Sequence, residues 1–451
     1  MGELKHVMTV WQRLILVACA GVLLGAGGRP ALVDAARTAD WVAVRALLTE
    51  RAEVNAAEGD GSTALHWASY HNDVESVELL IRSGADVNVS TDLRVTPLWT
   101  ASLNASAEIA QRLLEAGANP NAALQSGETP LMAASRSGSP EIVEQLLAKG
   151  ANANARAARQ QTALMWAVAQ KHSGVVTVLL AHGADVHARS EVWNQMMAVP
   201  PHGYAPYNKM IPHGGDTALL FAARAGDLAS AKLLIEAGAD VNDADAWGVS
   251  ATVLAAHSGY RELVEFLLEK GADPNRVEAG FSALHVAIMR RDEKMVSALL
   301  ARGADPNTPL RTWTPTRRSS RDFHFPPALV GASPLWLAAR VNEAGILRLL
   351  AKRGADPLFV HHADYMAGES TRRRVEATTA LMAALGMGGG AAWVQHDSGD
   401  RESLALETVK LAVELGVDVG AANTDGRTAL DAAKALNYDT VVSFLVENGA
   451  R

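Results

Sequence analysis

Cysteine is almost absent from this chain, which has 451 residues and a single cysteine, Cys19. If the segment before Pro30 is removed, the remaining chain contains no cysteine at all. Disulfides, thiol catalysis and thiolate zinc sites are then excluded from that part. A protein of this kind is simple to keep correctly folded in an oxidising compartment.

Basic residues are in deficit, because 41 Lys and Arg stand against 49 Asp and Glu, for a formal net charge of −8. A general nucleic-acid binder normally carries a basic surplus, so we expect no nucleic acid among the partners. Long apolar runs are missing too: the uncharged run Leu14–Ala26 is shorter than the roughly 20 residues that a membrane-spanning helix needs. We therefore expect no stable membrane span.

Residues 1–28 have the pattern of an export signal. Lys5 and Arg13 precede the apolar run, which ends in small residues, and cleavage is expected near residues 25–28. Two alternatives are an uncleaved anchor and a lipoprotein modified on Cys19, since residues 16–19 resemble a lipobox. The pattern predicts an exported protein, periplasmic or extracellular.

One stretch, Gly61–Asn88, reads as a complete helix–turn–helix unit. Thr63 is a suitable N-cap, two short apolar faces follow it, and Gly84 supplies the left-handed residue that ends the second helix. The closing sequence Gly-Ala-Asp-x-Asn recurs along the chain and predicts a turn. The opening residues recur at Thr63, Thr96, Thr129, Thr162, Thr217, Ser250, Ser282, Ser333, Thr379 and Thr428. The first three intervals and that from Thr217 to Ser250 are 33 residues each. We interpret residues 29–451 as a single array of about eleven repeats, whose last unit is a polar C-terminal cap.

The sequence Thr63-Ala64-Leu65-His66-Trp67-Ala68 and the 33-residue period resemble the ankyrin repeat. The resemblance implies an all-α solenoid of stacked helix–turn–helix units with short β-hairpin fingers. It also implies that His66 and His285 form hydrogen bonds between neighbouring repeats.

Four insertions interrupt the period, near residues 190–215, 308–331, 361–377 and 388–402. The first three follow the Gly-Ala-Asp turn and should extend fingers, whereas the fourth falls between two helices. The first two are rich in aromatic residues, and the second is rich in Arg; both residue types are frequent anchors of interfaces. The other reading is that these aromatics pack back on neighbouring fingers.

The resemblance implies a non-enzymatic scaffold that binds a protein partner through its concave face and finger loops, as a monomer and without cofactor or metal. The family's contact positions, together with the anchors in the insertions, give the following candidate partner-binding residues: Tyr70, His71, Arg136, Trp193, Tyr204, Tyr207, Arg224, Trp247, His257, Arg290, Arg311, Trp313, Arg317, Phe323 and Arg340.

Two histidine-rich segments could be read as metal ligands, His361-His362-x-Asp364 and His396-Asp397-x-x-Asp400. Neither has the helical spacing of a zinc motif, so we expect solvated loop residues. Residues 386–390 are glycine-rich without the context of a phosphate loop, which favours a flexible linker. For the basic run Arg372–Arg374 we expect a solvated helix face.

Three other functions remain open from the sequence. A secreted effector would use the same surface on a foreign protein, and a periplasmic stabiliser or inhibitor would bind an enzyme of its own cell. A hydrolase built on the insertions is the third, although no catalytic triad or carboxylate pair follows from local spacing.

Overall fold

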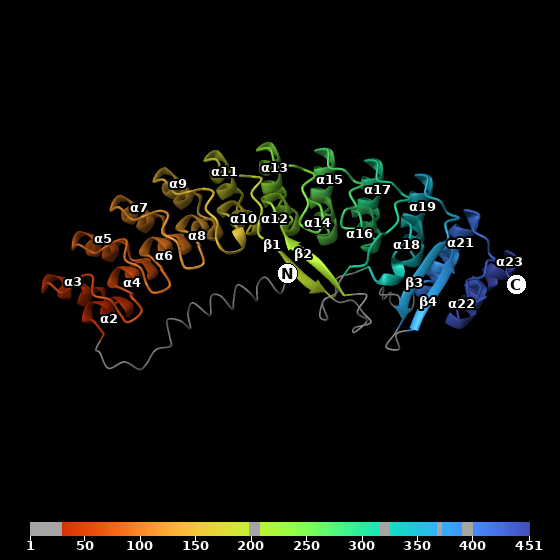
Figure 1. The fold of residues 1–451 in the computed structure, drawn as a ribbon, viewed down its shortest axis with the longest axis horizontal. Coiled ribbons are helices and arrows are strands. Elements are labelled where there is room, and N and C mark those ends of the chain that lie inside the picture. The colour runs from red at the N-terminus through yellow and green to blue at the C-terminus, as the bar shows by residue number, and fades with distance from the viewer. Residues whose placement is uncertain (1–28, 198–207, 315–324, 368–371, 390–399) are drawn as a thin grey trace. The chain divides into compact units, whose positions relative to one another are not determined.

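The computed structural model describes residues 29–197, 208–314, 325–367, 372–389 and 400–451. It divides into two compact units. The first ends at Ala122, the second begins at Ala123, and each is described by itself. Within each unit the chain forms antiparallel helix pairs joined by tight turns (Figure 1). None of the helices in the described ranges is long and apolar enough to cross a membrane.

The first unit contains three helix pairs. They are α2 (Ala31–Arg37) and α3 (Trp41–Thr49), α4 (Ala64–Tyr70) and α5 (Val74–Arg82), and α6 (Pro97–Leu103) and α7 (Ala107–Glu115). Thr63 and His66 form a capping box at the start of α4, since the Thr63 N–H donates to His66 Nδ1 at 3.2 Å. The Nε2 of His66 lies 2.9 Å from the carbonyl oxygen of Val95, in the next repeat, which confirms the expected link for His66.

The second unit contains eight helix pairs. They are α8 (Pro130–Ser137) and α9 (Pro140–Ala148), α10 (Ala163–Ala169) and α11 (Ser173–Ala181), α12 (Ala218–Ala225) and α13 (Leu228–Glu236), α14 (Ala251–Ser258) and α15 (Arg261–Glu269), α16 (Ala283–Met289) and α17 (Glu293–Ala301), α18 (Pro334–Arg340) and α19 (Ala344–Lys352), α20 (Ala380–Ala384) and α21 (Arg401–Glu414), and α22 (Ala429–Leu436) and α23 (Asp439–Glu447). First helices pack against first helices and second against second, so the apolar face of each pair is buried by its neighbours.

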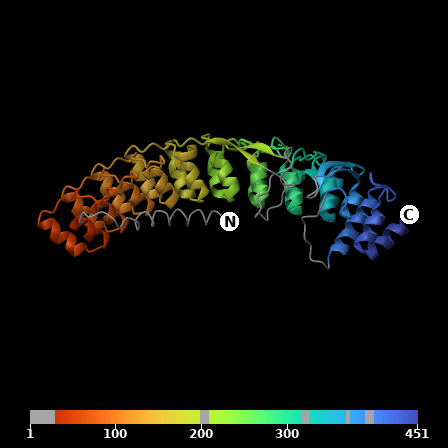
Figure 2. The ribbon, with the colours of Figure 1, turned by 60° about the horizontal axis from the view of Figure 1, so that its bottom comes forward.

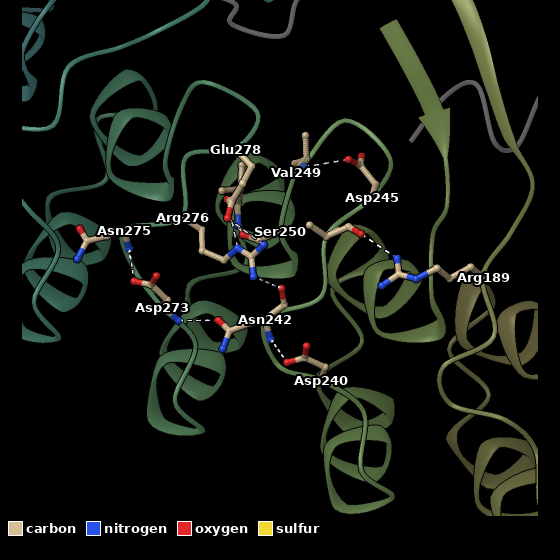
Figure 3. Close-up of polar contacts among 12 residues, drawn as sticks. Arg189, Asp240, Asn242, Asp245, Val249, Ser250, Asp273, Asn275, Arg276 and Glu278 are labelled. Atoms are coloured by element: carbon tan, nitrogen blue, oxygen red, sulfur yellow. Dashed lines mark hydrogen bonds and ion pairs between the residues drawn. The ribbon is translucent and has the colours of Figure 1, made fainter.

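Asparagine side chains tie successive turns of the second unit together. The Asp273 N–H donates to Asn242 Oδ1 at 2.8 Å, and the Asp305 N–H donates to Asn275 Oδ1 at 2.7 Å. Asn275 also donates to the carbonyl of Gly303 at 2.9 Å. Figure 3 shows this ladder around Asn242 and Asn275. The recurring Asn therefore fixes the spacing at which neighbouring repeats stack.

Two insertions form antiparallel β-ribbons. Strand β1 (Val192–Met197) pairs with β2 (Lys209–Gly214), and β3 (His361–Ala367) pairs with β4 (Arg372–Thr378). Both ribbons lie along the edge of the second unit where the finger turns run (Figure 2). The fold is thus the expected helical solenoid with β-hairpins, two of them enlarged.

Two expectations about the third insertion, a solvated His361 and a helix at Arg372–Arg374, were wrong. His361 is buried rather than solvated: its Nε2 donates to the carbonyl of Ala328 at 2.9 Å, and its ring lies 4.4 Å from the Trp336 ring. Burial lowers the pKa of this imidazole. Arg372–Arg374 are exposed, but they belong to strand β4 and not to a helix, because this segment pairs with β3.

The glycine-rich segment is also different from the linker we expected. Gly388 and Gly389 are buried in the structure. A Cβ at Gly388, whose φ is +78°, would lie 2.2 Å from Thr378 Oγ1, so only glycine fits there. His396 and Asp397 fall in residues 390–399, outside the described residues.

Candidate protein-binding groove at the finger edge

The β1–β2 ribbon is anchored at its base by Arg189. The Arg189 guanidinium donates to the carbonyls of Gly215 and Ala244, at 2.8 and 2.9 Å, and forms an ion pair with Asp243. Arg189 is labelled in Figure 3. The Asp243 side chain is only 8% exposed, so this pair is shielded on the carboxylate side. Arg189 therefore joins the ribbon to the next finger.

Backbone hydrogen bonds hold the same base on both sides. The Glu191 N–H donates to the carbonyl of Arg159 at 2.8 Å, and the Ala246 N–H donates to the carbonyl of Gly214 at 2.9 Å. The ribbon consequently occupies the place of an ordinary finger between its two neighbours.

The two faces of the ribbon differ. On one face the Trp193 ring stacks on the His213 ring, with 5.7 Å between their centres, and Ile211 is buried. The Arg159 guanidinium lies 4.6 Å from the centre of the Trp193 ring. On the other face the paired residues Met196 and Met210 are each more than half exposed. The face that carries Trp193, His213 and Ile211 is thus in contact with the protein itself. The face that carries Met196 and Met210 is open to solvent.

The described part of the second insertion folds back on the repeats. The Thr314 N–H donates to the carbonyl of Phe325 at 3.0 Å, which closes the neck of the insertion. The Phe325 side chain is 2% exposed and lies 5.5 Å from Phe281. Trp313 is 6% exposed. For these aromatics the packing interpretation holds, because their rings complete the core at the finger edge.

The two insertions meet in one groove of about 410 Å³. Its lining consists of strand β2, two finger tips and the start of the second insertion, namely Lys209, Met210, Ile211, Pro212, Trp247, Val277, Glu278, Ala279, Gly280, Arg311, Thr312 and Trp313. Lys209 Nζ lies 4.8 Å from the centre of the Trp313 ring and so bridges the two insertions. The groove brings together three of the predicted binding residues, Trp247, Arg311 and Trp313.

Finger geometry sets the position of Trp247. The Asp245 carboxylate accepts the N–H groups of Trp247 and Val249, both at 2.9 Å, and closes the turn. Burial raises the pKa of Asp245 against the opposing effect of these bonds. The Trp247 ring meets Phe281 edge to face at 5.7 Å and remains partly exposed.

Several of the other candidates already contact groups of the protein itself. In the second unit Arg224 pairs with Asp216 at 2.9 Å, and Arg290 Nη1 donates to the carbonyl of His257 at 2.7 Å. Arg340 is 8% exposed, and burial lowers the pKa of its guanidinium. A side chain so covered is a structural element in this conformation and not an open contact residue.

Arg136 belongs to the same structural class. It pairs with Glu128 at 2.8 Å and lies 5.3 Å from the Trp166 ring. Burial raises the pKa of Glu128, and Arg136 opposes that shift. In the first unit His71 Nε2 lies 3.0 Å from the carbonyl oxygen of Arg37, while Tyr70 is 46% exposed.

Four candidates, Tyr204, Tyr207, Arg317 and Phe323, lie outside the described residues. Sequence reasoning missed Lys209 and the finger tip Val277–Gly280 as parts of the groove. One available signal was Gly280, whose φ of +89° places it against Thr312, where an added Cβ would lie 2.4 Å from Thr312 Cγ2. Within the described residues, no cluster of His, Cys, Asp and Glu is arranged to hold a metal ion.

A family model described as ankyrin repeats (3 copies) matches residues 12–91, 32–123, 98–190, 199–278 and 219–309, which together span more than half of the chain. The crystal structure of the human ASB11 ankyrin repeat domain is 28% identical to this chain, with a TM-score of 0.45. That match covers 53% of this chain and 98% of the domain. A search of curated proteins finds no match.

Proposed function

The chain belongs to the ankyrin repeat family and is a protein–protein interaction scaffold of that kind, and from this premise we propose that it is exported and binds a protein partner in the groove between its first two insertions. Proteins built from these repeats are generally not enzymes, and the proposal assigns no catalytic step to this one. Export is proposed from the signal-like residues 1–28.

One observation carries the choice of site. Lys209 and Trp313 belong to different insertions, yet they are in contact across the groove. Both insertions thus contribute to a single concave surface with a partly exposed indole, Trp247, and two exposed cations. Interfaces gain most of their affinity from a few Trp, Tyr and Arg side chains at such a centre.

The groove is a better candidate than the ends of the first helices. There Arg224, Arg290 and Arg340 are engaged with the protein itself or are buried. Arg311 is an exposed side chain in the groove, and no ion pair joins it to a carboxylate among the described residues. A partner that binds in the groove therefore has fewer intramolecular contacts to displace than one that binds at the ends of the first helices.

Affinity capture with the native protein tests the proposal. We expect a specific partner, identified by mass spectrometry, whose capture falls more than about tenfold with Trp247→Ala combined with Arg311→Ala. Lys270→Ala combined with Arg348→Ala removes exposed cations elsewhere in the second unit and should leave capture unchanged. Point variants are preferable to deleting residues 308–331, because Trp313 and Phe325 in that segment are buried.

Unchanged capture by the groove variant would move the site elsewhere, first of all to Tyr70 and its neighbours. Cell fractionation and N-terminal sequencing test export: we expect a mature chain that begins near Arg29. An intact Met1 or a lipid on Cys19 would contradict cleavage there. A periplasmic location would favour a stabiliser or inhibitor, and recovery from the medium would favour an effector.

A further inference from the structure

We infer that the partner segment bound in the groove is acidic, with carboxylates that pair with Lys209 and Arg311 beside an apolar side chain on Trp247. This inference rests on the proposed function and adds the chemical class of the ligand. Three features of the groove lead to it: two exposed cations with no carboxylate partner among the described residues, one carboxylate that already pairs with an Arg, and an apolar wall.

The cations come from two different elements. Lys209 opens strand β2 and Arg311 lies at the start of the second insertion, and both side chains are exposed. Among the described residues, neither forms an ion pair with a carboxylate. Lys209 instead lies over the Trp313 ring, which attracts its ammonium group. Both charges are therefore available to a ligand.

The one acidic residue in the lining is already neutralised. Glu278 pairs with Arg276 through both carboxylate oxygens, at 3.0 and 3.2 Å (Figure 3). Burial acts to raise the pKa of Glu278, but backbone hydrogen bonds and Arg276 outweigh it and hold this pKa below its usual value. Since Arg276 compensates Glu278, Lys209 and Arg311 give the groove a local positive charge.

That local charge is opposite to the charge of the whole chain, which is −8. An acidic segment is repelled on average by an acidic protein and attracted by a confined positive groove. The local positive charge of the groove therefore attracts an acidic ligand in spite of the net charge of the chain.

The apolar wall supplies the rest of the contact. The partly exposed side chains of Trp247 and Val277 share the lining with Met210, which is 55% exposed. Because Trp313 is buried, Trp247 is the one aromatic ring of the lining with an open surface. Single-stranded nucleic acids usually bind through several stacking rings, so this arrangement fits a protein segment better.

Strand addition is an unsuitable mode of binding here. Pro212 lies in the middle of β2 and has no N–H to donate to an added strand. Recognition must therefore depend on the side chains, which are charged and aromatic.

The test uses fluorescence anisotropy of short labelled peptides with the full-length protein. The panel contains an acidic peptide with a central Trp, the same peptide with every acid changed to Lys, the acidic peptide with Trp changed to Gly, and an oligodeoxythymidine. We expect the acidic Trp peptide to bind more than about tenfold tighter than the Lys peptide, and its affinity to fall as the salt concentration rises from about 0.05 to about 0.5 M.

Lys209→Ala and Arg311→Ala should each weaken binding of the acidic peptide about threefold to fivefold, the usual range for one exposed ion pair. Lys270→Ala is the matched control, since its ammonium also lies over an aromatic ring, 5.7 Å from that of Phe266, on another element. It should leave binding unchanged. Circular dichroism melting confirms that the variants fold.

Three outcomes would overturn the inference. They are equal binding of the acidic and Lys peptides, tighter binding of the oligonucleotide, and no binding of the acidic peptide at concentrations up to about 1 mM. None of these affects the capture experiment with Trp247→Ala and Arg311→Ala. A groove-dependent partner that is not acidic would leave the proposed function intact and reject only the ligand class.

Discussion

The ammonium group of Lys209 lies 4.8 Å from the centre of the Trp313 ring, and this contact joins two insertions that are far apart in the sequence. It has two consequences. The start of the second insertion is a packed part of the second unit, because Trp313 is 6% exposed. The first residue of β2, Lys209, is held at the groove with its charge still exposed.

Removing this charge should loosen β2. Lys209→Met keeps the apolar stem of the side chain and deletes the ammonium group, so the local opening free energy should fall by about 0.5–1 kcal/mol. Hydrogen exchange of residues 208–214, followed by mass spectrometry, measures this. Lys270→Met deletes a comparable contact with Phe266 and should leave β2 unchanged. Equal exchange in wild type and Lys209→Met would show that the contact contributes no stability.

Removing the Arg189 side chain should free the base of the ribbon. Arg189→Ala leaves Asp243 buried without its cation, and three hydrogen bonds are lost. We expect a loss of about 2 kcal/mol in local stability, with faster hydrogen exchange in residues 190–197 and 208–216. Arg189→Ala combined with Asp243→Ala should recover part of that loss, because no buried carboxylate then remains unpaired.

The other ribbon offers a comparison for Arg189. Arg373 pairs with Asp364 at 2.6 Å, but their side chains are 70% and 53% exposed. Arg373→Ala should therefore change local exchange very little. If Arg189→Ala were equally silent, the ion pair with Asp243 would not anchor the ribbon.

His285 should make stability depend on pH. Burial lowers the pKa of this imidazole from 6.5 to about 4. Between these values the unfolded chain binds a proton that the folded chain does not, so stability falls as the pH drops from 6.5 towards 4. The full effect is about 3 kcal/mol, and above pH 6.5 it is absent.

His285→Gln should reduce this dependence. Glutamine at the third helical position can keep the capping box with Ser282, whose N–H donates to His285 Nδ1 at 3.1 Å in the wild type. Thermal melting at pH 7 and pH 5 should show a smaller difference for His285→Gln than for wild type. His187→Gln, at an exposed position, should behave as wild type. An unchanged difference in His285→Gln would assign the pH effect to other groups.

The last two helices should stabilise the pair before them. Val409 and Ala412 of α21 are buried in one cluster with Leu430, Val441 and Leu445 of α22 and α23. Deleting residues 428–451 exposes this face, so we expect aggregation or a clear loss of thermal stability. A truncated protein that stays monomeric and melts as before would contradict this.

A pair of point variants tests the same cluster without a deletion. Leu445→Ala removes a fully buried side chain and should cost about 2–5 kcal/mol. Val446→Ala, at the neighbouring position that is 53% exposed, should stay within about 0.5 kcal/mol of wild type. Differential scanning calorimetry distinguishes them.

Local signals in the sequence determined the helix pairs. A Thr or Ser side chain caps most first helices in the described chain, as where the Trp99 N–H donates to Thr96 Oγ1, and a left-handed Gly such as Gly84 ends the second helix. These features act over a few residues, so the period of the sequence is enough to place them. The stacking follows because each pair leaves an apolar face that only a neighbouring pair can bury.

The sequence also located the insertions, since each interrupts the period, but it did not determine their course. His361 is buried because the β3–β4 ribbon brings it against Trp336 and the carbonyl of Ala328. Nothing within a few residues of His361 indicates that contact. Its burial could not be predicted from residue type and neighbours.

The groove residues, too, were only partly predictable from the sequence. The family's contact positions identified Trp247, and the unusual content of aromatic and Arg residues in the second insertion identified Arg311 and Trp313, because only 5% of this chain is aromatic. Only the tertiary structure decided which of them are open and which are covered, and it added Lys209. Repeat architecture depends on short-range capping and burial, which the sequence encodes locally. The groove depends on contacts between segments far apart along the chain, and those exist only once the second unit has packed.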